Sequence, residues 1–257
     1  MKAPVELLMA LPAEQAGAQG GIAAVSVQDD GKLYAVPASL KTVDHIRYAV
    51  IHEASGYRTY ALLGGGTSFS DTQNHWSRDI ASDLANRMLL TGGGDGRFAP
   101  DRAVTRAELA ALTVRSLGLM GGEIPSAGFS DVASSSWVYE PAALAHRFGL
   151  MSGYPGGAFR GSGEVTREQA MTVVYNAVRL IQGGDGATDA AKANSTLSSF
   201  TDKSELSPWA SAAAAYLIDS GIVKGDGTRE LRPKDTLTRA EAAALIHRML
   251  QANGWID

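Results

Sequence analysis

Three arginines stand at positions where a positive charge needs a partner. Each follows a threonine and lies two places before a glutamate or glutamine, in the motifs Thr105-Arg106-Ala107-Glu108, Thr166-Arg167-Glu168-Gln169 and Thr238-Arg239-Ala240-Glu241. Thr-x-x-Glu/Gln is a capping box, so each arginine becomes the first residue of a helix. The helix dipole is positive there and disfavours a cation. A bound anion would reverse this, because it would accept hydrogen bonds from free backbone amides and from the guanidinium.

An ion pair is the competing interpretation of the arginines. A Phe-Ser/Thr-Asp motif precedes each of them and supplies a carboxylate, at Asp71, Asp131 and Asp202. A salt bridge from arginine to aspartate would explain the constant spacing without a ligand, and the aspartate could also orient the arginine toward one. The same carboxylates could instead cap the turn that follows them or accept hydrogen bonds from sugar hydroxyls.

Tryptophan and glycine recur in the same register. Trp76, Trp137 and Trp209 each precede their arginine by the same interval without a gap, and Gly92, Gly153 and Gly225 each follow their tryptophan by a second constant interval. A tryptophan at the start of an amphipathic helix belongs either to the core or, with its flat face, to a sugar site. The glycines are predicted to end the first helix with a positive φ, and their exposed backbone would let a sugar approach closely. The phenylalanines of the Phe-x-Asp motif are predicted to fill the core.

This register defines three homologous units, at 69–119, 129–181 and 200–250. Each predicts a helix from about the tryptophan to the glycine, a glycine-rich turn, and a second helix that begins at the threonine. The linker 182–199 predicts a flexible surface loop. Because one such repeat cannot bury its apolar face alone, we expect the three to pack around a shared axis, with the first helices at the centre and the second helices radiating outward.

The N-terminal segment, 1–66, has a different pattern. Short alternating or apolar segments predict strands, with turns at Asp29-Asp30-Gly31 and Ser55-Gly56. These strands are expected to form a small β meander, or part of a truncated sandwich. The segments are 5–11, 22–27, 32–36, 47–51 and 59–63. The chain is therefore predicted to be mainly α, with a β-rich segment over 1–66.

Composition excludes several functions. The chain has 257 residues, of which 45% are hydrophobic, so it can bury a core, and its net charge of −4 argues against a nucleic-acid partner. No apolar run is long enough for a membrane span. The absence of cysteine excludes thiol nucleophiles and disulfides. The five histidines lack metal-ligand spacing and no acidic pair stands out, so neither a metal, a cofactor nor an enzyme activity is predicted. Pro4 and Glu6 interrupt any apolar signal segment, so we expect an intracellular chain or a fragment of a longer protein.

The complete pattern resembles a known family. Phe-x-Asp, then Trp, then Gly-x-x-Gly-x-Phe-x-Pro and Thr-Arg-Ala-Glu is similar to the surface-layer homology (SLH) domains that occur in tandem threes on bacterial cell-surface proteins. The resemblance implies a monomer with a pseudo-threefold assembly and grooves between neighbouring repeats. It also implies non-covalent, non-catalytic binding of secondary cell-wall polysaccharide through a pyruvylated N-acetylmannosamine. The protein would then be secreted and held at the cell wall or S-layer, its signal peptide lying outside this chain.

Two other functions stay open at the sequence level: a scaffold or self-assembly module that binds a protein partner, and a hydrolase in the β-rich part. If the resemblance holds, the recurring aspartates, tryptophans, glycines and arginines are expected to form the glycan site, and the first and middle repeats are expected to matter most. Replacing an arginine of the set is expected to weaken binding and leave folding nearly intact. The residues are Asp71, Trp76, Gly92, Arg106, Asp131, Trp137, Gly153, Arg167, Asp202, Trp209, Gly225 and Arg239.

Overall fold

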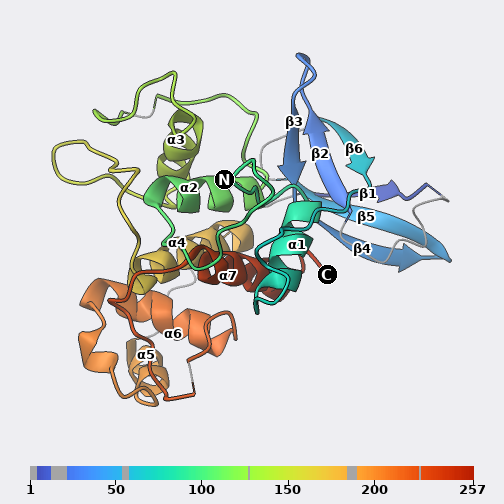
Figure 1. The fold of residues 1–257 in the computed structure, drawn as a ribbon. Helices are drawn as coiled ribbons and strands as arrows, with labels where there is room; N and C mark the ends of the chain where they lie inside the picture. Colours follow the sequence, from blue (N-terminus) through green and yellow to red (C-terminus); the bar gives the residue numbers. More distant parts are fainter. Residues whose placement is uncertain (1–4, 13–21, 54–57, 127, 184–189, 226) are drawn as a thin grey trace.

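A computed structural model describes residues 5–12, 22–53, 58–126, 128–183, 190–225 and 227–257 (Figure 1). A β-rich N-terminal part lies against one side of a larger helical part (Figure 1). The predicted turn at Ser55-Gly56 and residue 226 of the third glycine-rich turn lie outside the described residues.

Six strands form the described N-terminal part. They make two three-stranded antiparallel sheets, in the orders β1-β5-β4 and β3-β2-β6. Side chains of both sheets, among them Ala24, Val36 and Ile51, share one buried cluster, so the sheets pack face to face. The strands are β1 (Val5–Ala10), β2 (Ala23–Val27), β3 (Leu33–Val36), β4 (Ala38–Val43), β5 (Ile46–Glu53) and β6 (Thr59–Leu63).

The predicted single meander is wrong. β6 pairs with β2 rather than with its sequence neighbour β5, and β4 was not foreseen. The turn between β4 and β5 is made by Asp44 and His45, with φ of 48° and 65°. Tight hairpin turns with a positive φ usually contain glycine, because other residues rarely adopt this conformation. This turn has no glycine, so the usual residue pattern that predicts a hairpin is missing. The turn at Asp29-Asp30-Gly31 does connect β2 to β3 as predicted.

Seven α-helices carry the remainder of the described chain. Three pairs separated by glycine-rich loops confirm the three predicted helix–turn–helix units. The linker prediction is wrong in part, because α5 packs on α6 and buries Ala193 and Leu197, which lie one helical turn apart. The helices are α1 (Arg78–Asn86), α2 (Arg106–Ser116), α3 (Tyr139–Arg147), α4 (Arg167–Gln182), α5 (Ala190–Leu197), α6 (Ser211–Asp219) and α7 (Arg239–Ala252).

The second helices of the repeats, not the first, lie at the centre. Helices α2, α4 and α7 all contact one another, and α2 and α7 are buried over most of their length. Each first helix packs on the second helix of another repeat: α3 on α2, α6 on α4, and α1 on α7. The expected central position of the first helices is therefore wrong. Helix α1 buries only Ala81, Leu84 and Ala85 along one stripe, which suits a peripheral helix.

Backbone hydrogen bonds close the three repeats into a ring. The amide of Val104 donates to Leu237, that of Leu237 to Val165, and that of Val165 to Val104, over 2.8–3.3 Å. These residues occupy the same place in each repeat, immediately before the capping threonine. The first and third repeats are thus joined to each other as well as to the second.

The C-terminal residues contact strands β4 and β5 where the β-rich part docks. The ring of Trp255 stacks on His52 of β5, with centroids 5.2 Å apart. The Asp257 carboxylate accepts from the backbone amide of Leu40 at 2.8 Å, and Arg87, directly after α1, donates to the carbonyl of Ala38 at 2.7 Å. Docking therefore uses the first repeat and the C-terminal residues together.

Candidate functional site

All three capping boxes form as predicted. The hydroxyls of Thr105, Thr166 and Thr238 accept from the amide three places on, and the glutamate or glutamine there accepts from the threonine amide. Helices α2, α4 and α7 begin at the arginine that follows. The motif thus fixes the position of each arginine at a helix N-terminus.

The arginines reach across to the next repeat in the ring. The Nε atom of Arg106 donates to the carbonyl of Phe159 at 2.9 Å, that of Arg167 to Leu231 at 2.9 Å, and that of Arg239 to Phe98 at 2.8 Å. Each accepting residue lies seven places before the next repeat's capping threonine. Each guanidinium therefore ties the loop of one repeat to the helix of another.

The backbone amides at these helix starts are not free. Those of Arg106 and Ala107 donate to the carbonyls of Gly163 and Gly161, at 2.8 and 2.9 Å. The second and third repeats make the equivalent bonds to their neighbours, and the threonine takes the third amide. The expectation that an anion would bind free backbone amides here is therefore wrong, because the loop of the next repeat already occupies them.

Two of the arginines also bind the capping glutamate of the next repeat. The Nη1 atom of Arg239 lies 2.7 Å from Glu108 Oε1, and that of Arg167 lies 2.8 Å from Glu241 Oε1. Arg106 has no such partner in the described structure, since the equivalent residue of the second repeat is the neutral Gln169. Its Nη2 donates to the carbonyl of Ser152 at 2.9 Å instead.

Aromatic rings complete the surroundings of Arg106, which is buried. Its guanidinium lies 4.7 Å from the Tyr154 ring centroid and 5.1 Å from that of Phe159. Arg160 covers the same tyrosine at 4.4 Å. Burial lowers the pKa of Arg106, and the charge of Arg160 lowers it further. The guanidinium nonetheless stays protonated at physiological pH, so positive charge collects around one tyrosine.

The aspartates cap a backbone loop and do not pair with these arginines in the described structure. Asp71 accepts from the amides of Phe98 and Ala99 at 2.9 and 2.8 Å, and Asp131 accepts from Phe159 and Arg160, both at 2.7 Å. Asp202 accepts equivalently from residues 231 and 232. The backbone hydrogen bonds lower the pKa of the Asp131 carboxyl. The aspartates therefore position the loop whose carbonyl receives the arginine.

The glycines are needed for space rather than for a positive φ. A Cβ atom added to Gly92, Gly153 or Gly225 would lie 2.5–2.7 Å from the ring of the repeat's own phenylalanine, and none of the three has a left-handed backbone. The expected helix-ending role is therefore wrong. The phenylalanines do pack in the helical core, as predicted.

The tryptophans are exposed. The exposed fractions of Trp76, Trp137 and Trp209 are 57%, 63% and 56%. This excludes the core interpretation and leaves large aromatic surfaces available at the start of each first helix.

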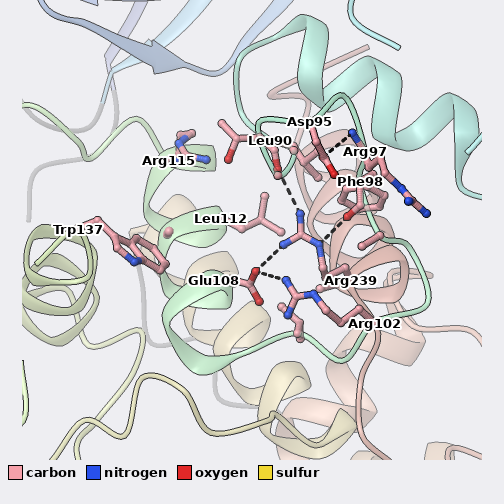
Figure 2. A pocket seen from close by; sticks show the side chains of 17 residues that line it. Leu90, Asp95, Arg97, Phe98, Arg102, Glu108, Leu112, Arg115, Trp137 and Arg239 are labelled. Atoms are coloured by element: carbon pink, nitrogen blue, oxygen red, sulfur yellow. Dashed lines mark hydrogen bonds and ion pairs between the residues drawn. The ribbon is translucent and has the colours of Figure 1, made fainter. Parts of the chain in front are cut away.

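A cavity of about 560 Å³ brings parts of all three repeats together. We call it the first-repeat cavity. Its wall is the loop after α1 and one side of α2; Arg239 enters from the third repeat and Trp137 from the second (Figure 2). Glu108 bridges Arg239 and Arg102 on one side, Trp137 lies opposite, and Leu112 lies between them (Figure 2). The volume is in the range of small-molecule sites.

A smaller cavity of about 180 Å³ repeats this construction. We call it the third-repeat cavity. Gly225 and Glu241 come from the third repeat, Arg167 from the second and Trp76 from the first. Sequence reasoning selected the tryptophans, arginines and glycines of both cavities and expected grooves between neighbouring repeats, but it did not predict which repeat supplies which residue to a groove. It missed Arg115 and Arg248, which line the two cavities and occupy equivalent positions of the first and third repeats, nine places after the helix-starting arginine.

The profile of the S-layer homology domain matches residues 68–110, 128–171 and 199–243, just over half of the chain. The chain belongs to the S-layer homology domain family. Each match lies over one of the three repeats, which together line the first-repeat cavity and the third-repeat cavity.

Relatives of the SLH chain include surface proteins and enzymes. It is 30% identical over 212 residues to an amylopullulanase of Thermoanaerobacterium thermosulfurigenes, covering 82% of this chain and 11% of that protein. It is 26% identical over 180 residues to the surface-layer 125 kDa protein of Lysinibacillus sphaericus, 68% of this chain and 14% of that protein. It is 29% identical over 170 residues to a cellulosome-anchoring protein of Acetivibrio thermocellus, 63% of this chain and 35% of that protein. The chain thus spans a minor part of each, and the amylopullulanase carries this region as one part of a much larger protein.

No described helix of the SLH chain is both long and apolar enough to span a membrane.

Proposed function

We propose that this SLH chain anchors a larger protein to the cell wall by binding a pyruvylated secondary cell-wall polysaccharide non-covalently. The observation that carries the proposal is the first-repeat cavity, in which an exposed tryptophan faces several arginines across a partly apolar wall. Aromatic faces stack on sugar rings and guanidinium groups bind carboxylates. A sugar that bears a pyruvyl carboxylate, such as pyruvylated N-acetylmannosamine, needs both features.

Each type of residue has its own role in this proposal. Trp76, Trp137 and Trp209 stack on the sugar, and the arginines hold the loop and attract the anion. The aspartates and glycines shape the loop by capping it and by admitting the phenylalanine beneath it. The SLH chain contributes binding, not catalysis. Surface-layer and cellulosome-anchoring proteins among the relatives support a role at the cell wall.

We further propose that the helical part of a monomer has pseudo-threefold symmetry, with repeats at 69–119, 129–181 and 200–250. The equivalent backbone bonds among Val104, Val165 and Leu237 support this arrangement. So does the exchange of arginines around the ring. A symmetric ring would give three related grooves on one chain and allow multivalent attachment to a repeating polymer.

A cosedimentation experiment tests the proposed function. The full chain is incubated with purified peptidoglycan–polysaccharide from a Gram-positive wall, and with the same material after mild acid removal of pyruvate. We expect binding to the first and loss of binding to the second. Binding that survives depyruvylation would contradict the proposal. Binding that requires wall protein would favour the alternative of a scaffold for a protein partner.

A further inference from the structure

One arginine of the first-repeat cavity stands apart from the ion-pair network. Arg239 uses three of its nitrogens, donating to Phe98, Glu108 and Thr91, and Arg102 also binds Glu108. Arg115 has only a 3.4 Å hydrogen bond from Nη1 to the carbonyl of Leu89, and no carboxylate partner within the described chain. Figure 2 shows it on a separate side of the cavity from the Glu108 network.

The environment of Arg115 makes its charge costly in the absence of an anion. Burial lowers its pKa, and no neighbouring carboxylate of the described chain compensates. A guanidinium with unused donors beside a solvent-accessible cavity can donate two hydrogen bonds to one carboxylate of a ligand. Trp137, exposed across the same cavity, can support the ring that carries this carboxylate.

The third-repeat cavity has the same arrangement. Arg248 occupies the place of Arg115, at the same interval from the helix-starting arginine, and lines the cavity with Trp76. In the described structure it makes neither a hydrogen bond nor an ion pair. Here too the capping glutamate, Glu241, holds the helix-starting Arg167 and leaves the second arginine for a ligand.

The second repeat carries two compensating changes. Asn176 replaces the second arginine and donates to the carbonyl of Leu150, which is equivalent to Leu89. Gln169 replaces the glutamate, so the Nη1 atom of Arg106 lacks the carboxylate that holds its counterparts. Within the described structure, a guanidinium without an ion pair to a carboxylate therefore recurs: Arg115 in the first-repeat cavity, Arg248 in the third-repeat cavity, and Arg106 where it meets the loop of the second repeat.

We propose that the anionic group of the ligand binds Arg115 in the first-repeat cavity and Arg248 in the third, while Arg106 takes this role where it meets the loop of the second repeat. The inference rests on the proposed function and assigns its anion contacts. Arg239 and Arg167 are then positioning residues, which hold the loops of the first and third cavities through their carbonyl and glutamate contacts.

The test replaces Arg115 with the residue that the second repeat already has. Arg115→Asn removes the charge and keeps a donor for the Leu89 carbonyl, as Asn176 does for Leu150. The probe is the pyruvylated N-acetylmannosamine monosaccharide, titrated into ¹⁵N-labelled full chain. The indole N–H signals of Trp137 and Trp76 report the first and third cavities separately, and buried Trp255 is an internal reference.

We expect Arg115→Asn to raise the dissociation constant read at Trp137 about tenfold or more, because a charge-assisted contact is lost. The value read at Trp76 should change by less than twofold. Arg248→Asn should give the reverse pattern. Arg78→Asn, which removes an equal charge from an exposed side chain outside both cavities, should change neither value.

The reciprocal variant acts on the second repeat. Gln169→Glu supplies Arg106 with the carboxylate that the other two arginines have, and should weaken binding there by a similar factor. The reporter is Trp209, which corresponds by repeat order to Trp137 beside Arg239 and to Trp76 beside Arg167. Unchanged affinity at Trp137 in a folded Arg115→Asn chain would overturn the assignment. If the unaltered chain binds the pyruvylated sugar no better than the same sugar without pyruvate, the proposed function itself fails.

Discussion

Replacing Arg106 with alanine should destabilise the protein, whereas its position at a helix N-terminus alone would predict no loss. The residue is 7% exposed and donates to two carbonyls of the second repeat, Phe159 and Ser152, each at 2.9 Å. Losing two charge-assisted hydrogen bonds costs about 3 kcal/mol or more, and the contact with the Tyr154 ring adds about 0.5–1 kcal/mol. Two effects offset part of this loss. Removing the cation from the positive end of the helix dipole stabilises the folded state by about 0.3–1 kcal/mol. The free energy cost of desolvating the guanidinium on folding also disappears. The net loss should be about 2 kcal/mol.

Urea unfolding followed by far-ultraviolet circular dichroism measures this loss. Thr105→Ala, which removes only the cap of the same helix, is the matched control and should cost about 1 kcal/mol. An Arg106→Ala chain within about 0.5 kcal/mol of the unaltered protein would refute the reasoning. It would mean that water replaces the guanidinium at both carbonyls without cost.

Two further predictions concern packing and pH. Gly153→Ala should lower the free energy of unfolding by about 1–3 kcal/mol in urea titrations, because its Cβ would lie 2.6 Å from the Phe129 ring; Gly66→Ala, with open space around it, should be nearly neutral. Burial lowers the pKa of His52, so below about pH 6.5 the unfolded chain binds a proton that the folded chain does not, and stability should fall as the pH decreases from there. In His52→Phe, unfolding free energies measured at neutral pH and at about pH 5.5 should differ less than in the unaltered protein; an equal difference would assign the pH dependence to other groups.

Local rules predicted the parts of the site that depend on neighbours in sequence. A capping box needs only residues three positions apart, so Thr105 and Glu108 predict both the helix and its first residue. The core role of Phe69, Phe129 and Phe200 follows equally from their apolar character and register. These features form as predicted because tertiary contacts leave them intact: Glu108 caps the helix through Oε2 while it binds Arg239 through Oε1.

Contacts between repeats could not be predicted in this way. Arg106 and Phe159 belong to different repeats, far apart in the chain, and no pattern within either repeat encodes their hydrogen bond. The central place of α2, α4 and α7 likewise depends on how three nearly equivalent helices share one core. Gly92 shows the same limit, since its requirement arises from the ring of Phe69 and not from its own backbone angles.

The construction of the first-repeat cavity links binding to closure of the ring. Its loop and α2 belong to the first repeat, Trp137 to the second and Arg239 to the third. Arg239 reaches the cavity only because α7 starts beside Arg102 and Ala103, where its amide donates to the Arg102 carbonyl at 2.9 Å. A single repeat would therefore have the loop and the α2 wall of the site without Trp137 and Arg239. The smallest unit that can form this cavity is the set of three, which gives a physical reason for the repeats to remain in register along one chain.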